Sequence, residues 1–131
     1  MSRILVVDDH EMARRSVRAL LESHHGWIVC GEAFDGLQAI EQAKSLRPDL
    51  IVMDVSMPNM NGLDATRIIV REIPGSRVLL ISQNDPDIVM RLMAEANAHG
   101  FVSKSELGKN LICAAERTLS ADDQATTERA V

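Results

Sequence analysis

Four of the apolar runs in this 131-residue chain end in side chains that could do chemistry together. Asp8 and Asp9 follow the first run, and Asp54, Ser82 and Lys104 each follow one of the later runs. Each residue alone has an ordinary structural explanation, because acids cap helices, serine is common in turns and lysine is usually a surface charge. If the runs are strands of one sheet, these explanations do not account for the presence of all five residues at one edge of it.

The chemistry that uses all of these groups is phosphoryl transfer. Three carboxylates about 4 Å apart repel by about 4 kcal/mol per pair at an effective dielectric constant near 20, so a divalent cation must lie among them. Oxygen ligands of this kind are those that Mg²⁺ prefers. Asp54 can then act as the nucleophile, while the Lys104 ammonium and the Ser82 hydroxyl bind phosphoryl oxygens. The residue types therefore predict Mg²⁺-dependent phosphorylation of Asp54.

The elements that must position these residues alternate between strands and helices. Short, unbroken apolar runs predict strands that are buried on both faces, and apolar residues at helical spacing predict amphipathic helices between them. A last helix, capped by Ser105, is expected to run to about Leu119. The expected strands are 4–7, 27–30, 50–53, 78–81 and 101–103, and the other expected helices are 11–23, 35–46, 63–73 and 86–96.

This order of elements predicts the fold. Alternating strands and helices with short links form a parallel sheet that is covered on both faces, and right-handed crossovers restrict its winding. We expect a single α/β domain, a flavodoxin-like, doubly wound five-stranded parallel sheet with strand order 2-1-3-4-5. In such a sheet the functional crevice lies at the carboxyl ends of the strands, where the polar residues stand.

The composition excludes some classes of function. The formal charge of −5 and pI near 5.3 argue against direct binding of nucleic acid, because such domains carry an excess of lysine and arginine. The N-terminus resembles neither a signal peptide nor a membrane span, so we expect a cytoplasmic protein without membrane association. Cys30 and Cys113 lie in apolar stretches without metal-type spacing, and we expect both to be reduced core residues.

Four blocks of the sequence resemble a known family. They are LVVDD at 5–9, MDVSMPNMNG at 53–62, LIS at 80–82 and GFVSK at 100–104. Together they are similar to the conserved blocks of CheY-like response-regulator receiver domains, over nearly the whole chain. Within that family the similarity is greatest to NarL/FixJ-like two-component response regulators, through His10 after the acid pair, the DVSMP loop at 54–58 and Ser105 after Lys104.

The resemblance implies a role for each residue. Asp54 accepts a phosphoryl group from a sensor histidine kinase, Ser82 and Lys104 bind that group, and Phe101 and Gln83 take part in the conformational switch. The implied Mg²⁺ ligands are Asp8, Asp9, Asp54 and the backbone carbonyl of Ser56.

Three positions depart from the commonest family pattern. Ser105 stands where proline often follows the lysine, so we expect a trans peptide there. Gln83 is longer than the usual residue after Ser82 and could alter the switch. Asn97 stands where many relatives have glycine, and asparagine also tolerates a left-handed helix C-cap.

Other functions fit the residues less well. An aspartate-based small-molecule phosphatase needs a second acid two residues after its nucleophile, where this chain has Ser56. A nucleotide-binding domain needs a glycine-rich turn after its first strand, where this chain has acids. A receiver that no longer takes phosphate would not need the complete set of polar residues. We therefore expect no enzyme, but a phosphoacceptor signalling domain that assists its own phosphorylation and dephosphorylation.

The output stays open at this point. We interpret 1–119 as a receiver domain and 120–131 as a flexible tail or the start of a linker. NarL/FixJ-like receivers usually precede a helix-turn-helix domain, so we expect transcription regulation through a DNA-binding domain outside this chain. The alternative is a single-domain regulator that acts through protein contacts, and a homodimer formed on phosphorylation would be one such contact.

Overall fold

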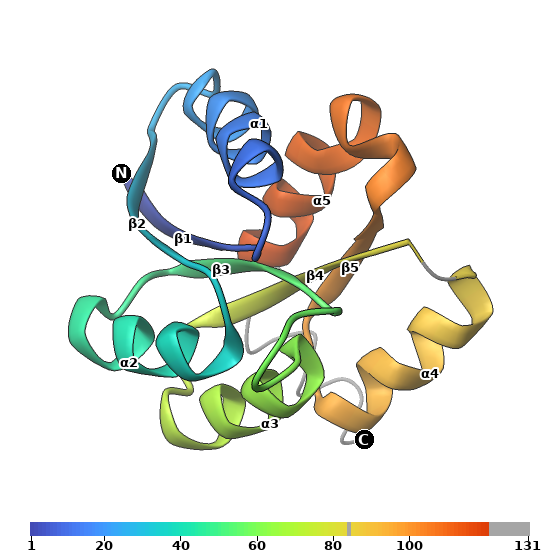
Figure 1. Cartoon of the computed structure of the whole chain (residues 1–131). Helices are drawn as coiled ribbons and strands as arrows, with labels where there is room; N and C mark the ends of the chain where they lie inside the picture. Colours follow the sequence, from blue (N-terminus) through green and yellow to red (C-terminus); the bar gives the residue numbers. More distant parts are fainter. Residues whose placement is uncertain (84, 121–131) are drawn as a thin grey trace, which may run out of the picture.

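A five-stranded parallel sheet forms the centre of the computed structural model, which describes residues 1–83 and 85–120 (Figure 1). The strands are β1 (Ser2–Val7), β2 (Trp27–Ala33), β3 (Leu50–Asp54), β4 (Arg77–Ser82) and β5 (Gly100–Ser103). Their order is β2-β1-β3-β4-β5, and every neighbouring pair is parallel. The predicted flavodoxin-like winding and strand order are confirmed.

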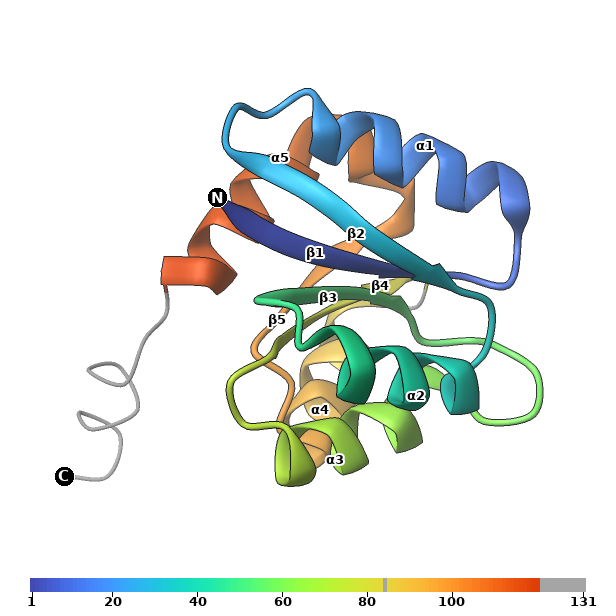
Figure 2. The same cartoon turned by 90° about the vertical axis from the view of Figure 1, so that its left-hand side faces the viewer.

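Helices cover both faces of the sheet. One face carries α1 and α5, and the other carries α2, α3 and α4 (Figures 1 and 2). A short 3₁₀ turn, η1, joins β5 to α5. The helices are α1 (Glu11–Glu22), α2 (Gly36–Leu46), α3 (Gly62–Glu72), α4 (Pro86–Ala96) and α5 (Leu107–Ser120), and η1 is Lys104–Glu106.

The central strands are buried on both faces. In β1, Ile4 and Val6 enter the core beneath α1 and α5, whereas Leu5 and Val7 enter the core beneath α2 and α3. These four side chains are at most 1% exposed, and each such burial contributes about 1.5–3 kcal/mol to stability. Burial on both faces explains why the strands appear in the sequence as unbroken apolar runs.

The second strand is longer than its apolar run. We expected it to end at Cys30, whereas β2 continues through Gly31 and Glu32 to Ala33. Because β2 is an edge strand, the Glu32 side chain avoids the core and pairs with arginines of α1. A polar residue therefore ended the apolar pattern without ending the strand.

The expectations for Ser105 and for the burial of the two cysteines are wrong. Ser105 does not cap α5, because it lies in η1 and its Oγ is 2.9 Å from Oγ of Ser103. Cys113 is exposed and Cys30 is only half-buried, although both are free as expected. Leu111 belongs to the inward face of α5, and Cys113 does not share that face. Apolar neighbours in the sequence did not reveal on which side of the helix this cysteine lies.

Other local expectations are confirmed. Asn97 is the C-cap of α4 with φ of 62° and ψ of 33°, the left-handed conformation that asparagine tolerates. The peptide between Lys104 and Ser105 is trans, as is every other peptide of the described part. The interpretation of 120–131 as a flexible tail or the start of a linker stays a prediction, because residues 121–131 lie outside the described residues. Within 1–83 and 85–120, no helix has the length and apolarity to span a membrane.

Candidate functional site

The carboxyl ends of four strands bring the predicted polar residues to one edge of the sheet. Asp54 is the last residue of β3, Ser82 is the last residue of β4, Asp8 follows β1 and Lys104 follows β5. Lys104 Nζ lies 3.2 Å from Asp8 Oδ2 and 3.3 Å from Asp54 Oδ2. The lysine thus joins the ends of three strands across the sheet.

An acidic cluster lies beside this lysine. Asp8, Asp9, His10 and Asp54 each offer one ligand atom, and these atoms all lie within 4.8 Å of one another. Asp8 and Asp54 are only 2% and 4% exposed. Asp8 Oδ2 and Asp9 Oδ1 are buried, and they lie 3.2 Å from Lys104 Nζ and 3.2 Å from His10 Nδ1, respectively. Buried carboxylate oxygens this close together suit a hard divalent cation, so the cluster is consistent with a Mg²⁺ site.

The charges at this site do not balance. Burial raises the pKa of Asp54, the negative charge of Asp8 raises it further, and Lys104 only partly opposes both. Burial alone would lower the pKa of Lys104, but the carboxylates of Asp54 and Asp8 outweigh it, so the net shift of that pKa is upward. Lys104 therefore stays an ammonium, and one ammonium faces three carboxylates. The excess negative charge is what a bound cation would neutralise.

The chain after Asp54 is held close to its carboxylate. Ser56 is exposed, and its backbone N–H donates to Asp54 Oδ1 at 3.4 Å. The Gly62 N–H donates to the Val55 carbonyl at 2.9 Å, which closes the loop between β3 and α3. A Cβ at Gly62 would collide with the Asp54 carbonyl oxygen, so this position requires glycine.

The N-terminus of α2 fastens the tip of this loop. Asn59, at φ of 66°, donates through Nδ2 to Asp35 Oδ2 at 3.0 Å, while Asp35 Oδ1 caps α2 at Gln38 N–H. The Gly36 N–H donates to the Met60 carbonyl at 2.9 Å, and a Cβ on Gly36 would collide with that carbonyl oxygen. The loop that carries Ser56 is thus closed at its base and anchored at its tip.

Sequence reasoning missed Arg14, because the helical pattern places it on the solvent face of α1. Its Nη1 donates to the Asp8 carbonyl at 2.9 Å, and its Nε donates to Glu32 Oε1 at 3.1 Å. Arg18 donates to Glu32 Oε2 at 2.7 Å. The two arginines lower the pKa of Glu32 despite the opposing effect of burial. Arg14 therefore ties the acid-bearing loop to the edge strand, a contact between distant segments that no local pattern revealed.

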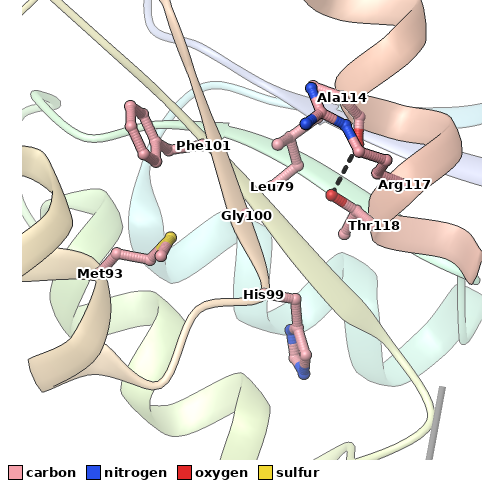
Figure 3. A pocket seen from close by; sticks show the side chains of 8 residues that line it. All are labelled: Leu79, Met93, His99, Gly100, Phe101, Ala114, Arg117 and Thr118. Atoms are coloured by element: carbon pink, nitrogen blue, oxygen red, sulfur yellow. Dashed lines mark hydrogen bonds between the residues drawn. The ribbon is translucent and has the colours of Figure 1, made fainter. Parts of the chain in front are cut away.

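The predicted switch residues lie around β4 and β5. Ser82 is 2% exposed, Gln83 is exposed and Phe101 is half-buried. Gln83 and Phe101 line the same cavity of about 580 Å³. Phe101 also borders a second cavity of about 290 Å³ with Met93 and His99, where it lies across β5 from α5 (Figure 3). The Phe101 ring, on the edge strand β5, therefore has open space beside it.

Comparison with known proteins decides the family. The family model for the response regulator receiver domain matches residues 4–116. The chain belongs to this family. Receiver domains are the phosphoacceptor partners of histidine kinases in two-component signalling, so the resemblance noted from the sequence blocks is confirmed at the level of the family.

Curated relatives share the receiver but extend beyond it. The response regulator GacA of Pseudomonas viridiflava is 36% identical over 104 residues, which cover 79% of this chain and 49% of GacA. A protein-glutamate methylesterase/protein-glutamine glutaminase of Alkalilimnicola ehrlichii is 44% identical over 104 residues, which cover 78% of this chain and 26% of that protein. The chain thus spans about half or less of the length of these relatives.

Solved structures support the same placement. A LuxR-family two-component response regulator from Aurantimonas sp. SI85-9A1 superposes with a TM-score of 0.87 and 33% identity, over 92% of this chain and 86% of that one. The response regulator domain of Thermotoga maritima CheB has a TM-score of 0.85 and 28% identity, over 93% of this chain and 98% of that one. A NarL receiver domain from Mycobacterium tuberculosis has a TM-score of 0.75 and 33% identity, over 85% of this chain and 93% of that one.

Proposed function

We propose that Asp54 accepts a phosphoryl group from the phosphohistidine of a sensor histidine kinase. The observation that supports this most strongly is the position of Asp54 at the end of the central strand β3. Its carboxylate shares the Lys104 ammonium with Asp8 at 3.3 and 3.2 Å. A buried carboxylate beside an ammonium and two further acids has the parts needed for phosphoryl transfer.

In this reaction the phosphorus–nitrogen bond of the kinase breaks and a phosphorus–oxygen bond to the Asp54 carboxylate forms. The kinase imidazole leaves, and Lys104 exchanges a carboxylate partner for a phosphoryl oxygen. The Ser82 hydroxyl, at the end of the neighbouring strand, donates a hydrogen bond to another phosphoryl oxygen. A bound Mg²⁺ would neutralise negative charge that develops on the phosphoryl oxygens. Its proposed ligands are the side chains of Asp8, Asp9 and Asp54 and the backbone carbonyl of Ser56.

We infer that the new bonds drive a conformational switch. Moving a two-state equilibrium from about 1:99 to 99:1 requires about 5.5 kcal/mol of differential binding. A charge-assisted hydrogen bond to Ser82 contributes about 1.5–3 kcal/mol of this. Lys104 adds the difference between its new phosphoryl partner and the carboxylate partner that it gives up. Phe101 then moves into the open space beside β5, and the exposed Gln83 changes position with the loop that follows Ser82. The surface of α4, β5 and α5 is altered as a result.

The output that we propose is transcription regulation through a DNA-binding domain outside this chain. The similarity to a LuxR-family response regulator supports it, as does 34% identity over 120 residues to a Pseudomonas aeruginosa protein named as a transcriptional regulator. The alternative is a single-domain regulator that acts through protein contacts, including a phosphorylation-dependent homodimer. The complete reading frame of the gene distinguishes the two, because only the first needs a basic helix-turn-helix segment.

The phosphoacceptor assignment is tested with acetyl phosphate and Mg²⁺ on wild type and Asp54→Asn. Asp64→Asn is the matched control, because Asp64 is an exposed aspartate on α3. Intact-mass spectrometry should show the added mass of one phosphoryl group in wild type and Asp64→Asn and none in Asp54→Asn. Phosphorylation that persists in Asp54→Asn would refute the assignment.

A further inference from the structure

His10 brings an imidazole to the edge of the acidic cluster. The residue precedes α1 and its side chain makes no capping hydrogen bond. Its Nδ1 lies 3.2 Å from Asp9 Oδ1 and 3.4 Å from Asp8 Oδ1. Asp9 Oδ1 is buried, and its contact with the imidazole is short enough for a histidine–carboxylate ion pair. The two atoms therefore face each other at a spacing that suits either a direct ion pair or two ligands of one cation.

The spacing of these atoms matches that of neighbouring ligands on one cation. In an octahedron with metal–ligand bonds of about 2.1 Å, adjacent ligand atoms are about 3 Å apart and opposite ones are about 4.2 Å apart. Nδ1 of His10 lies at close to the adjacent spacing from both acids, and the four donor atoms of the cluster span no more than 4.8 Å. One ion can therefore contact the imidazole and the carboxylates together after small movements of the side chains.

The backbone of His10 is fixed, so the ring needs little ordering to reach an ion. The His10 N–H donates to Asp8 Oδ1 at 2.9 Å, and its carbonyl accepts from the Arg14 N–H at 3.0 Å. Asp8, with a side chain only 3% exposed, directs its other oxygen, Oδ2, toward the Lys104 ammonium at 3.2 Å. The imidazole itself is 70% exposed and stands on the open side of the cluster.

We propose that His10 Nδ1 is a metal ligand and that the cluster binds divalent transition-metal ions more tightly than Mg²⁺. This inference rests on the metal site of the proposed function. An all-oxygen site suits Mg²⁺, whereas an imidazole among carboxylates favours Mn²⁺, Co²⁺ and Ni²⁺ in increasing order. Such an ion would compete with Mg²⁺ for the same carboxylates, so the site would respond to transition metals as well as to phosphorylation.

Metal titration of the tag-free protein tests the proposal. Mg²⁺ and Ni²⁺ are titrated by calorimetry into wild type, His10→Gln and His25→Gln. His25→Gln is the control, because His25 is also exposed but precedes β2, at the amino end of that strand, whereas the acidic cluster lies at the carboxyl ends of the strands. His10→Gln should weaken Ni²⁺ binding about tenfold or more and change Mg²⁺ binding less than about twofold. His25→Gln should change neither.

Two results would overturn the proposal. If His10→Gln leaves Ni²⁺ affinity unchanged, the imidazole is not a ligand. If it changes the affinities for Ni²⁺ and Mg²⁺ by the same factor, His10 acts through its contacts with Asp8 and Asp9 and is not a ligand. The visible spectrum of the Co²⁺ complex is a second readout, and it should differ between wild type and His10→Gln. Failure of the proposed function gives other results than failure of the His10 proposal. In that case wild type binds no Mg²⁺, or Asp54 stays unphosphorylated.

Discussion

Asp54→Asn should stabilise the metal-free receiver at neutral pH. The substitution removes one of the buried negative charges and keeps an oxygen that can accept from the Ser56 N–H, which now donates to Asp54 Oδ1 at 3.4 Å. Lys104 keeps its second carboxylate partner, since its Nζ also lies 3.2 Å from Asp8 Oδ2. A site designed for phosphorylation thus costs the resting domain stability.

The magnitude follows from the distances. At an effective dielectric constant near 20, attraction between Asp54 and Lys104 at 3.3 Å is worth about 5 kcal/mol. Repulsion from Asp8 and from Asp9, at separations up to 4.8 Å, is worth about 3.5 kcal/mol or more each. Repulsion and burial together exceed the attraction, as the raised pKa of Asp54 indicates. We expect Asp54→Asn to gain about 1–2 kcal/mol, or about 4–8 °C in Tm.

The pH dependence has a definite sign. Because folding raises the pKa of Asp54, its contribution to stability is fully present below the unfolded-state pKa of about 4 and is lost as pH rises through the higher pKa of the folded state. The advantage of Asp54→Asn should therefore vanish near pH 4 and be complete at pH 7. Saturating Mg²⁺ should reduce it, because the ion binds the folded wild type and adds about 2.7 kcal/mol at 100 times Kd.

Urea or thermal unfolding without Mg²⁺, from pH 4 to pH 8, measures this effect. Asp64→Asn is the control, because its exposed ion pair with Arg67 at 2.6 Å should be worth less than about 1 kcal/mol. If Asp54→Asn is less stable than wild type at pH 7, or if its advantage does not depend on pH, the reasoning from like charges is wrong.

Four further substitutions test other parts of the site. Asp9→Ala should weaken Mg²⁺ binding at least about tenfold in calorimetry and slow phosphorylation. The circular dichroism spectrum should stay unchanged. An unchanged Mg²⁺ affinity would remove the reason for placing the ion beside Asp9. Arg14→Gln should lower the free energy of unfolding in urea by about 1–2 kcal/mol and weaken Mg²⁺ binding. If Arg14 and Glu32 act as one unit, adding Glu32→Gln to Arg14→Gln should lower the free energy of unfolding little further. Ser82→Ala should abolish the amide-exchange response of α4 and β5 to beryllofluoride, and an equal response in both proteins would contradict coupling through this hydroxyl.

The sequence predicted the fold and the strand-end residues because both depend on local patterns. Apolar runs such as 50–53 mark strands buried on both faces, and the parallel topology then places Asp54, Asp8 and Lys104 at one edge. Lys104 meets both acids at 3.2–3.3 Å, as that reasoning requires. The roles assigned to these residues and the identity of the ion stay predictions.

Contacts between distant segments could not be predicted in the same way. The bridge from Arg14 to Glu32 joins a helix to the part of an edge strand that lies beyond the predicted strand. His10 entered the sequence reasoning only as a mark of similarity, because nothing in a single sequence shows that its ring approaches Asp9. The exposed position of Cys113 was missed because its neighbours are apolar, whereas the helical face depends on how α5 packs.

The central claim, phosphorylation at Asp54, is tested most directly by borohydride trapping of the aspartyl phosphate. Reduction converts an acyl phosphate to a homoserine residue, which peptide mass spectrometry can place in the chain. After treatment with acetyl phosphate and Mg²⁺, position 54 should carry the homoserine, and neither Asp8 nor Asp9 should be modified. Homoserine at Asp8 or Asp9 with an intact Asp54 would contradict the account.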